Sequence, residues 1–492
     1  MAELVDAVRR RAHDTPDAPL IDAPAEHRLV TARDLADDAA AIAATLRHLG
    51  IGPGHAVACH VGNRTGYFPL LIACFDVGAA LLPIDGSAPA PEVTTVVERF
   101  EASAVVLPAG RDDTRATHVL PAGLRLARRA DPGTPVPAGV GMLKLTSGST
   151  GLPKSTITTE QQLAADGRAL IPTVGIRPDD WNLGAIPVSH SYALGNIVAP
   201  LFLQGTKVVL RDTFVPAQIL DDASRVGARL FAGVPFMFDR LVAMLRDGGV
   251  WPTSIQTLIS AGAPLDRATA RAFATATGRR IHSLYGTSET GGIAYDTEPD
   301  PDGEVTMGRP VPGVTLGFWP DDAATGDIGR IHVTGPAVSS GYALGADDAA
   351  FTGGGFLTGD LGHLGADGRL RLRGRVSAFV NVAGRKVQPD EVERVLREHP
   401  LVAEARVFGL PDERRGEQLV ACVVPRDGAL GVVALRGWLA ERLAAYKIPR
   451  ALVFVAELPR DERGKVSRRA LEGIVQAGTE GHGASPAAGG VV

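Results

Sequence analysis

Cysteines, long apolar runs and a visible leader segment are scarce or missing in this sequence. Its 492 residues include 3 cysteines, each in an apolar context, which is typical of buried reduced thiols and disfavours a disulfide framework or a metal site. The start of the chain has no basic segment followed by an apolar one, so no secretory signal is visible. The longest apolar stretch, residues 68–84, contains Asp76 and Gly78 and falls short of a membrane span. We therefore expect a cytoplasmic protein with no membrane partner.

An excess of charge of either sign is also missing. The 50 Lys and Arg residues against 55 Asp and Glu give a formal net charge of −5, too small to make nucleic acid or an anionic membrane the main partner. Any anion must therefore be bound locally, by a few residues. Only six of the 50 cationic residues are lysines, so each lysine position is informative: Lys144, Lys154, Lys207, Lys386, Lys447 and Lys465.

What is present is the composition of a large packed protein. Hydrophobic residues make up 45% and charged residues 21% of the chain, which is ordinary globular usage. The length corresponds to about three domain-equivalents. Apolar residues at helical spacing over 32–49, a strand-like run over 55–61 and a helical run over 67–77 indicate βα order and a mainly parallel sheet. The same alternation returns over residues 182–265, with strands expected near 208–210, 230–232 and 257–260, and predicts a second α/β unit.

The last third of the chain changes character twice. Frequent Gly and Pro with short strands over 303–372 predict a compact β subdomain. Beyond a boundary at about 374–377, strands and helices predict a small α+β unit, with strands at 379–382, 403–408, 418–424 and 451–455 and helices at 388–398 and 432–443. We expect an N-terminal domain over residues 1–374, a C-terminal domain over 375–476 and a disordered tail, rich in Gly, Ala and Ser, over 477–492.

The strongest local signal is a loop rich in Gly, Ser and Thr that ends in a lysine. It runs from Leu145 to Lys154 and offers free backbone N–H groups, hydroxyls and one cation, which is what a polyphosphate needs. Pro153 stands where a Walker A motif has glycine, so this is a different phosphate loop. A plain surface loop is the alternative for this segment taken alone.

A second signal is the run Tyr285-Gly-Thr-Ser-Glu-Thr-Gly291. An aromatic ring that can stack on a base, a glycine turn, two hydroxyls and the carboxylate of Glu289 could hold a nucleotide with its Mg²⁺. A hydrolase nucleophile at Ser288 is disfavoured, because that motif needs glycine where Thr290 stands. Alone, this signal is weak.

Two further segments carry charged groups in polar loops. Asp360 follows Thr358-Gly359 and precedes Arg375, and a carboxylate with an arginine can bind the hydroxyls of a ribose. Lys465, in a polar loop near the end of the chain, is one of the scarce lysines. Taken singly, Asp360 and Arg375 are better explained as a turn acid and a solvated surface charge, and a generic turn is the alternative for the loop of Lys465.

In this order, the four segments resemble the adenylate-forming superfamily of acyl- and aryl-CoA ligases, adenylation domains and luciferases. The resemblance covers about residues 16–471. It implies a large N-terminal domain of two α/β sheets plus a β-barrel-like subdomain, joined by a hinge to a small mobile α+β C-terminal domain. It also implies an ATP- and Mg²⁺-dependent ligase that forms an acyl-adenylate with release of pyrophosphate and passes the acyl group to a thiol.

The resemblance assigns expected roles to individual residues. Glu289 would be the Mg²⁺ ligand, and Lys465 would bridge the acyl carboxylate and the α-phosphate. The hinge position carries Ser377 where the family has an acidic residue, which puts the ease of domain rotation in doubt. The expected ATP-binding residues are Thr146, Ser147, Gly148, Ser149, Thr150, Gly151, Lys154, Gly262, Ala263, Pro264, Tyr285, Gly286, Thr287, Ser288, Asp360 and Arg375, and the expected tunnel residues for coenzyme A are Gly384, Arg385 and Lys386.

The segment from Pro187 to Pro200 resembles the wall of the acyl pocket in acyl- and aryl-CoA ligases. It includes their pocket-gating histidine at His190, and it has no carboxylate, which disfavours an α-amino acid. The expected wall is apolar and partly aromatic and suits an aryl or medium hydrophobic acyl group: Tyr192, Val234, Phe236, Gly262, Gly286, Gly291 and Ile293.

The sequence leaves the acceptor of the acyl group open. Coenzyme A is the first expectation, and the alternative is the phosphopantetheine of a carrier protein acting in trans, or an amine. A nucleotide-binding protein that has lost catalysis is a third hypothesis, against which the joint presence of Glu289, Asp360, Arg375 and Lys465 argues. The identity of the acid and the oligomeric state are not readable.

Overall fold

The computed structural model divides into two compact units. The first comprises Met1–Gly317, His332–Thr358 and Leu364–Arg371, and the second comprises the rest. The expected boundary near 374 differs from this division, because the second unit also includes Phe318–Ile331 and Gly359–His363. The structure describes residues 3–480 apart from 111–116, 130–135, 147–153, 299–305, 321–326, 346–348, 377–379, 383–384, 388, 413–415, 427–429, 444–446 and 461–465.

A seven-stranded sheet of order β6-β7-β5-β3-β4-β8-β9 forms one half of the first unit. Strands β5, β3, β4 and β8 are parallel, and β7, β6 and β9 are antiparallel additions at the two edges. The strands are β3 (Ala56–Cys59), β4 (Ala80–Pro83), β5 (Ala104–Pro108), β6 (His118–Leu120), β7 (Leu124–Arg128), β8 (Met142–Thr146) and β9 (Lys154–Thr158).

A nine-stranded sheet of order β16-β15-β14-β13-β12-β10-β11-β1-β2 forms the other half. Its centre is parallel, as expected, and β2, β15 and β16 are antiparallel at the edges. The strands are β1 (Pro19–Ala23), β2 (Arg28–Thr31), β10 (Trp181–Gly184), β11 (Lys207–Leu210), β12 (Leu230–Gly233), β13 (Thr257–Ser260), β14 (His282–Thr287), β15 (Gly291–Tyr295) and β16 (Arg309–Pro310).

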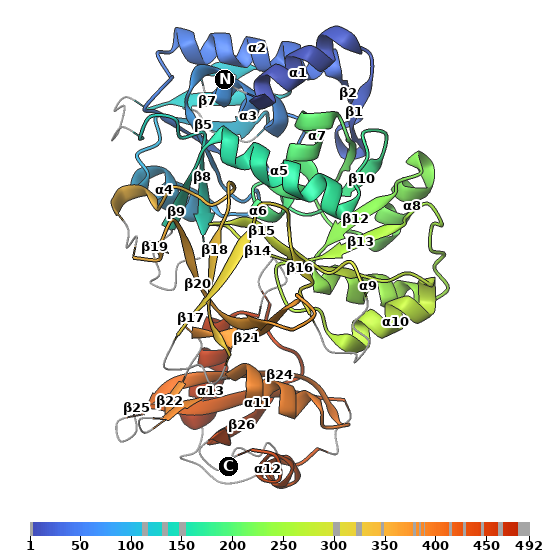
Figure 1. Ribbon diagram of the computed structural model, residues 1–492, viewed down its shortest axis with the longest axis vertical. Helices are drawn as coiled ribbons and strands as arrows, with labels where there is room; N and C mark the ends of the chain where they lie inside the picture. Colours follow the sequence, from blue (N-terminus) through green and yellow to red (C-terminus); the bar gives the residue numbers. More distant parts are fainter. Residues whose placement is uncertain are drawn as a thin grey trace. The chain divides into compact units, whose positions relative to one another are not determined.

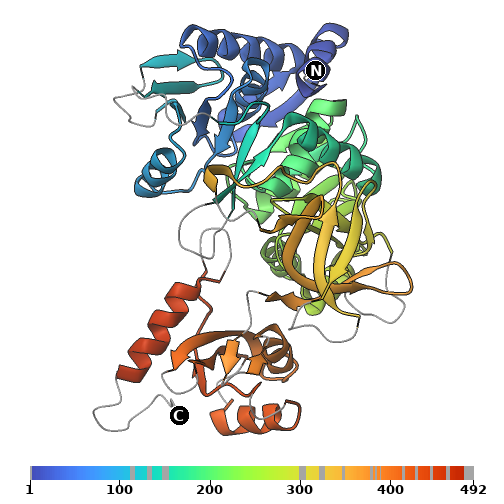
Figure 2. The ribbon, with the colours of Figure 1, turned by 60° about the vertical axis from the view of Figure 1, so that its left-hand side comes forward.

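Helices cover both sheets (Figure 1 and Figure 2). One apolar core contains buried residues from both sheets and from the helices between them, such as Val57 of β3 and Phe231 of β12. The helical elements of the first unit are α1 (Glu3–Asp14), η1 (Pro24–Glu26), α2 (Ala32–His48), α3 (Tyr67–Val77), α4 (Ala90–Arg99), α5 (Glu160–Val174), α6 (Ser191–Ala193), the π-helix η2 (Leu194–Val198), α7 (Ala199–Gln204), α8 (Pro216–Val226), α9 (Pro235–Arg246), α10 (Arg267–Thr277) and η3 (Ala343–Gly345). The helix expected over 67–77 has these bounds.

Helix α5 carries a charged residue into the core. It begins at a capping box, in which the Thr159 hydroxyl accepts a hydrogen bond from the N–H of Gln162 and the Gln162 side chain accepts one from the N–H of Thr159. It ends at Gly175, whose φ of 75° is the left-handed conformation that glycine adopts without strain. Its buried face includes Leu163 and Leu170 and, between them, Asp166.

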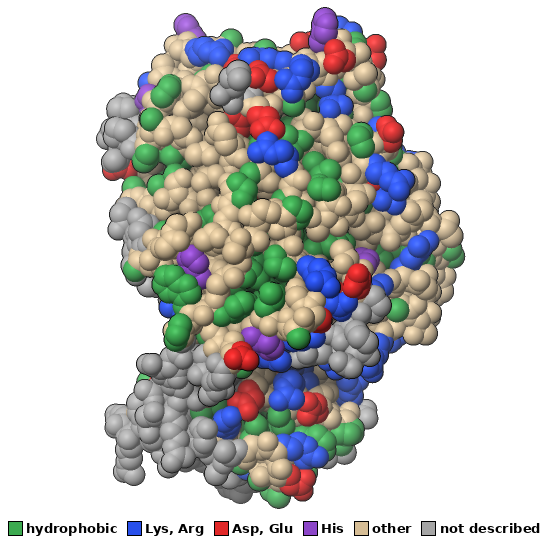
Figure 3. All heavy atoms as spheres, in the orientation of Figure 1, with side chains coloured by type: hydrophobic (Ala, Val, Ile, Leu, Met, Phe, Trp, Pro, Cys, Tyr) green, Lys and Arg blue, Asp and Glu red, His purple; other side chains and the backbone are tan. Residues whose placement is uncertain are grey.

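A five-stranded sheet of order β17-β18-β20-β19, with β21 paired to β20, corresponds to the expected β subdomain. Its strands are β17 (Thr315–Trp319), β18 (Gly329–Thr334), β19 (Phe351–Thr352), β20 (Gly355–Leu364) and β21 (Leu370–Arg375). On the face drawn in Figure 3, acidic and basic side chains of the first unit are interspersed. Within the described part of the chain, no helix is long and apolar enough to cross a membrane.

The second unit contains a five-stranded sheet covered by helices on both faces. In β25, Leu419, Ala421 and Val423 belong to one apolar cluster and Val420 and Cys422 to another, as the alternation of side chains along a strand requires. The elements are β22 (Val380–Val382), β23 (Arg385–Val387), α11 (Pro389–Arg397), β24 (Val402–Asp412), β25 (Gly416–Pro425), α12 (Val432–Ala440), β26 (Ala451–Phe454) and α13 (Arg468–Glu480). The disordered tail expected from residue 477 is corrected at its start, because α13 continues through 477–480; residues 481–492 lie outside the described residues.

Candidate functional site

The ends of two neighbouring parallel strands bring the predicted adenine-binding residues into one region. β13 ends at Ser260 and is followed by Gly262, Ala263 and Pro264, all exposed, while β14 contains Tyr285, which is buried with 8% of its surface exposed. Gly262 has a φ of +83°, so the chain turns there in a conformation that other residues adopt only with strain. The carboxyl ends of strands in an open α/β sheet are where such folds bind ligands.

The turn between β14 and β15 depends on two glycines and holds its hydroxyls in place. A Cβ on Gly286 would lie 2.5 Å from the carbonyl oxygen of Gly291, so a side chain cannot be accommodated there. The hydroxyls of Thr287 and Thr290 are 3.1 Å apart, and the N–H of Glu289 donates to the Thr287 hydroxyl over 3.2 Å. Ser288 and the Glu289 carboxylate are half-buried beside this turn.

The predicted phosphate loop is the connection of a β-hairpin. In the register of β8 and β9, Thr146 lies opposite Lys154, so the two ends of the loop are held together. The ammonium of Lys154 lies 5.6 Å from the centre of the Tyr342 ring. Ser147, Gly148, Ser149, Thr150 and Gly151 lie outside the described residues.

Tyr342 connects this loop to Glu289 and was not predicted from the sequence. Its hydroxyl donates a hydrogen bond to Glu289 Oε1 over 2.8 Å, and its backbone pairs with Thr156 of β9. The backbone carbonyl of Glu289 accepts a hydrogen bond from the N–H of Ser339 over 2.7 Å. The Glu289 carboxylate is therefore oriented by a residue 53 positions away. No periodic pattern marks Tyr342 in the sequence.

The donor set near Glu289 fits Mg²⁺ that is shared with a nucleotide. No group of three or more His, Cys, Asp or Glu side chains suited to a metal is found among the described residues. Mg²⁺ is commonly held by one or two carboxylates together with substrate phosphates. One half-buried carboxylate close to the end of a phosphate loop matches that requirement.

Asp360 and Arg375, expected to bind ribose, are in contact within the second unit. Arg375 Nε lies 2.6 Å from Asp360 Oδ1, and the arginine side chain is 61% exposed whereas the aspartate side chain is 9% exposed. Because the carboxylate is buried and the guanidinium is exposed, a ligand could reach this pair through the N–H groups of Arg375.

The predicted acyl-pocket residues are positioned by long-range hydrogen bonds. His190 Nε2 lies 3.1 Å from Asp85 Oδ2, a carboxylate that the sequence did not single out. The Tyr192 hydroxyl donates to the carbonyl oxygens of Gly233, 3.3 Å away, and Ile259, 3.0 Å away, at the ends of β12 and β13. Burial raises the pKa of Tyr192, so the ring stays a neutral donor.

The remaining wall residues come from the start of α9, from β15 and from the loop after β13. Val234 is the residue before α9, and Phe236 lies in its first turn with the guanidinium of Arg240 5.1 Å from the ring centre. Gly291 and Ile293 both lie on β15, two residues apart and therefore on the same face, with Ile293 fully buried. A Cβ on Gly262 would lie 3.7 Å from Val234, which places these two wall residues side by side.

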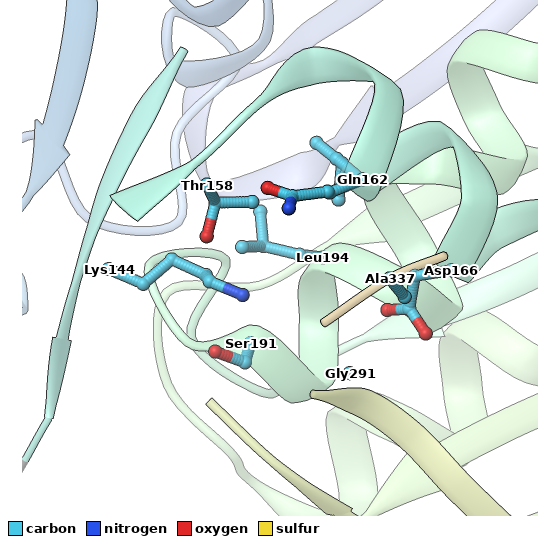
Figure 4. A pocket seen from close by; sticks show the side chains of 9 residues that line it. Lys144, Thr158, Gln162, Asp166, Ser191, Leu194, Gly291 and Ala337 are labelled. Atoms are coloured by element: carbon cyan, nitrogen blue, oxygen red, sulfur yellow. The ribbon is translucent and has the colours of Figure 1, made fainter. Parts of the chain in front are cut away.

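A small cavity of mixed polar and apolar lining lies beside this wall and contains two charged residues that the sequence analysis did not assign. Lys144 of β8 and Asp166 of α5 line it together with Gln162, Ser191 and Gly291 (Figure 4). Lys144 is 5% exposed and Asp166 6%. The scarcity of lysine, and the position of this one inside the apolar strand β8, were the available signals.

Burial displaces the pKa values of both charged groups in the cavity. It lowers the pKa of Lys144 to about 8, an effect that Asp166 and Glu289 oppose, and it raises the pKa of Asp166 against the hydrogen bond from the Gly292 N–H. Both directions follow from the cost of keeping a charge away from water.

We expect the lowered pKa of Lys144 to make the stability of the fold depend on pH. The unfolded lysine keeps its proton up to its ordinary pKa of 10.5, whereas the folded one loses it near 8, so the fold gains stability as the pH rises between these values. Relative to the neutral variant Lys144→Met/Asp166→Asn, the thermal midpoint of the wild type should rise by about 2 °C between pH 7.5 and 10. Differential scanning calorimetry would measure it, and a midpoint difference independent of pH would contradict it.

Several predicted residues cannot be placed. Lys465, Ser377 and Gly384 lie outside the described residues, and Arg385 and Lys386 are described only as backbone of β23. Their expected roles remain predictions.

Comparison with known proteins gives one consistent result. A family model described as AMP-binding enzyme matches residues 8–343, and one described as AMP-binding enzyme C-terminal domain matches residues 391–465. A sulfoacetate–CoA ligase from Cupriavidus necator is 30% identical, covering 94% of this chain and 96% of its own length. A feruloyl-CoA synthase from an Amycolatopsis species is also 30% identical, covering 93% of this chain and 96% of its own length.

The fold is shared with solved structures. The ATP-bound crystal structure of MatB from Rhodopseudomonas palustris matches with a TM-score of 0.82 at 24% identity, covering 96% of this chain and 99% of that one. The expected fold class, a large α/β domain with a small α+β domain after it, is thereby confirmed.

Proposed function

The chain belongs to the AMP-binding enzyme family, and from this premise we propose that its substrate is an aryl or hydrophobic carboxylic acid. It is an AMP-forming acid-thiol ligase: it activates a carboxylic acid with ATP as an acyl-adenylate, releases pyrophosphate and transfers the acyl group to the thiol of coenzyme A. We further propose that Mg²⁺ is its metal and that the reaction takes place in the cytoplasm.

The proposed ATP site uses the strand ends and the hairpin described above. Tyr285 stacks on adenine, with Gly262, Ala263 and Pro264 on the other side. Asp360 and Arg375 bind the ribose hydroxyls. The loop from Thr146 to Lys154 holds the β- and γ-phosphates, and Glu289 holds Mg²⁺. The observation that carries this proposal is the chain of contacts from Lys154 through Tyr342 to Glu289, which puts a cation and an oriented carboxylate at one end of the phosphate loop.

The proposed chemistry explains why these groups are needed. A carboxylate oxygen of the acid attacks the α-phosphorus, the bond from that phosphorus to the bridging oxygen breaks, and pyrophosphate leaves. Both reactants are anions, so positive charge must offset their repulsion in the transition state. Lys465 would supply one positive charge between the carboxylate and the α-phosphate, and Glu289 would hold a Mg²⁺ ion that would add positive charge at the phosphates. In the second step the thiol loses its proton, its sulfur attacks the acyl carbon, the bond from that carbon to the phosphate oxygen breaks, and AMP leaves. Gly384 is the residue proposed to line the path of the thiol.

Pyrophosphate release tests this function directly. The enzyme is incubated with ATP, Mg²⁺ and a panel of aryl, fatty and small carboxylic acids, with and without coenzyme A. We expect one acid class to give release that coenzyme A stimulates. Slow release that hydroxylamine traps and coenzyme A does not change would indicate the alternative acceptor, a carrier-protein phosphopantetheine or an amine. No release with any acid would contradict the ligase activity.

A substitution at His190 tests the acyl pocket. His190 Nε2 is held by the Asp85 carboxylate and the side chain is 39% exposed, which supports the proposal that the ring acts at the mouth of the acyl pocket rather than in the core. His190→Ala is expected to lower kcat/KM for the acid about tenfold, the value of one positioned hydrogen-bonding group. Asp85→Asn keeps a hydrogen-bond partner for the ring and should have a smaller effect. Equal, full activity of both variants would exclude His190 from the pocket.

A further inference from the structure

The cavity beside the acyl wall contains two charged side chains, Lys144 and Asp166, which leave room between them for a polar group of a ligand. Figure 4 shows the Lys144 amine reaching into the cavity from β8, with the Asp166 carboxylate on the opposite side. Among the described residues, the Lys144 amine has no hydrogen bond and no carboxylate within 4 Å, although the residue is 5% exposed. A buried ammonium without a partner is costly unless a further polar group reaches it.

Asp166 is fixed by backbone and cannot move to meet the lysine without losing contacts. Its Oδ1 accepts a hydrogen bond from the Gly292 N–H over 2.9 Å. A Cβ on Gly195 would lie 2.4 Å from Asp166 Oδ2, and one on Gly291 would lie 2.6 Å from Oδ1. Two glycines therefore make room for this carboxylate. A structural ion pair would place the two charges in contact, whereas here a space separates them.

The cavity adjoins the proposed acyl pocket. Gly291 lines the cavity and is also part of the predicted wall, and Ser191, which lines it too, stands between His190 and Tyr192. A substituent of an acid held against that wall is therefore close enough to enter the space between Lys144 and Asp166.

The charges around the cavity select the kind of substituent. Lys144 and Asp166 cancel each other, and Glu289 is a second negative group that acts on Lys144, so a further anion gains little here. A hydrocarbon would leave the Lys144 ammonium without a hydrogen-bonding partner and would leave Asp166 with the Gly292 N–H as its partner. A hydroxyl satisfies both, because it accepts a hydrogen bond from an ammonium and donates one to a carboxylate.

We propose that Lys144 and Asp166 form a specificity subsite for a hydroxyl group on the acyl part of the substrate. This rests on the proposed ligase function and narrows its substrate to hydroxylated acids. Lys144 donates to the hydroxyl oxygen, and the hydroxyl proton is donated to Asp166. Both are specificity residues in this role, since neither touches the reacting carboxylate.

The test uses pairs of acids that differ by one hydroxyl: hydroxycinnamic against cinnamic, hydroxybenzoic against benzoic, and hydroxyhexanoic against hexanoic acid. For each pair, kcat/KM for pyrophosphate release is measured with the wild type, Lys144→Met, Asp166→Asn and the double variant. The wild type should prefer one hydroxylated acid by about 10²-fold or more, because a site built for a hydroxyl leaves polar groups unpaired with the analogue that lacks it. Each single variant should lower that ratio at least tenfold. Lys207→Met, a substitution on β11 outside the cavity, should keep it.

Two further measurements make every outcome decisive. The thermal midpoint of the double variant, in which no buried charge is left alone, shows that the fold is kept. Binding of the same acid pairs to the full-length protein is measured by calorimetry. A binding preference that Lys144→Met removes, without pyrophosphate release by any acid, would overturn the ligase function and support the subsite. No preference in the wild type, or one that the variants retain, would overturn the subsite and leave the pair bridged by water only.

Discussion

Replacing Lys465 by alanine is expected to lower the rate of pyrophosphate release by ~10²–10³-fold, the typical cost of removing one preorganised stabiliser of transition-state charge. The reason is electrostatic: two anions must approach, and this lysine would be the side chain placed between them. The effect should fall on kcat as well as on kcat/KM, because the contact is made in the transition state. The acid that gives the highest wild-type rate is the substrate to use.

The matched control is another of the six lysines. Lys447 belongs to the second unit as Lys465 does, and its ammonium lies 2.7 Å from Glu391. Lys447→Ala removes a partly exposed ion pair and should cost little activity. Unchanged pyrophosphate release in Lys465→Ala, with the protein folded, would remove this residue from the mechanism and with it the assignment of its loop.

Glu289→Gln is expected to reduce pyrophosphate release by a similar ~10²–10³-fold. Glutamine keeps the size of the side chain and can still accept the hydrogen bond from Tyr342 but loses the negative charge that Mg²⁺ needs. The loss should therefore be partly relieved at high Mg²⁺ concentration. A titration of the rate against Mg²⁺ for both proteins measures this.

Tyr342→Phe separates the charge of Glu289 from its orientation. It removes the hydroxyl that donates to Glu289 Oε1 while keeping the ring beside Lys154. We expect the rate of pyrophosphate release to fall about tenfold, as for the loss of one hydrogen bond to a charged group, with a Mg²⁺ dependence close to that of the wild type.

For Glu289→Gln, a rate equal to that of the wild type at every Mg²⁺ concentration would show that the metal is held elsewhere.

Local patterns predicted most of the secondary structure. The helix expected over 67–77 has the observed bounds, and the strands expected near 208–210, 230–232 and 257–260 correspond to β11, β12 and β13. These elements are buried and bounded by glycines or turns, so their apolar periodicity and their ends were both visible. The start of the tail was misplaced because a composition rich in Gly and Ala at a chain terminus is typical of coil, although α13 continues to Glu480.

The contacts of the site were less accessible to sequence reasoning. Asp85 meets His190 across 105 positions, and Asp166 meets Gly292 across 126. Periodicity and motif spacing describe neighbours along the chain and carry no information about such pairs. The Gly-rich motifs were found because they are contiguous, whereas the groups that orient them were supplied by other strands.

The glycines around Asp166 couple several positions of this region in evolution. A Cβ on Gly195 would lie 2.4 Å from Asp166 Oδ2 and one on Gly291 would lie 2.6 Å from Oδ1, so neither glycine can be replaced without movement of the aspartate. A shorter residue at 166 alone does not make these positions permissive, because a Cβ on Gly195 would still lie 2.7 Å from Leu170 Cδ1 and because the φ of +69° at Gly291 strains any other residue. A different set of side chains at this wall therefore requires joint changes at several positions, which are inherited as one coupled unit rather than as independent sites.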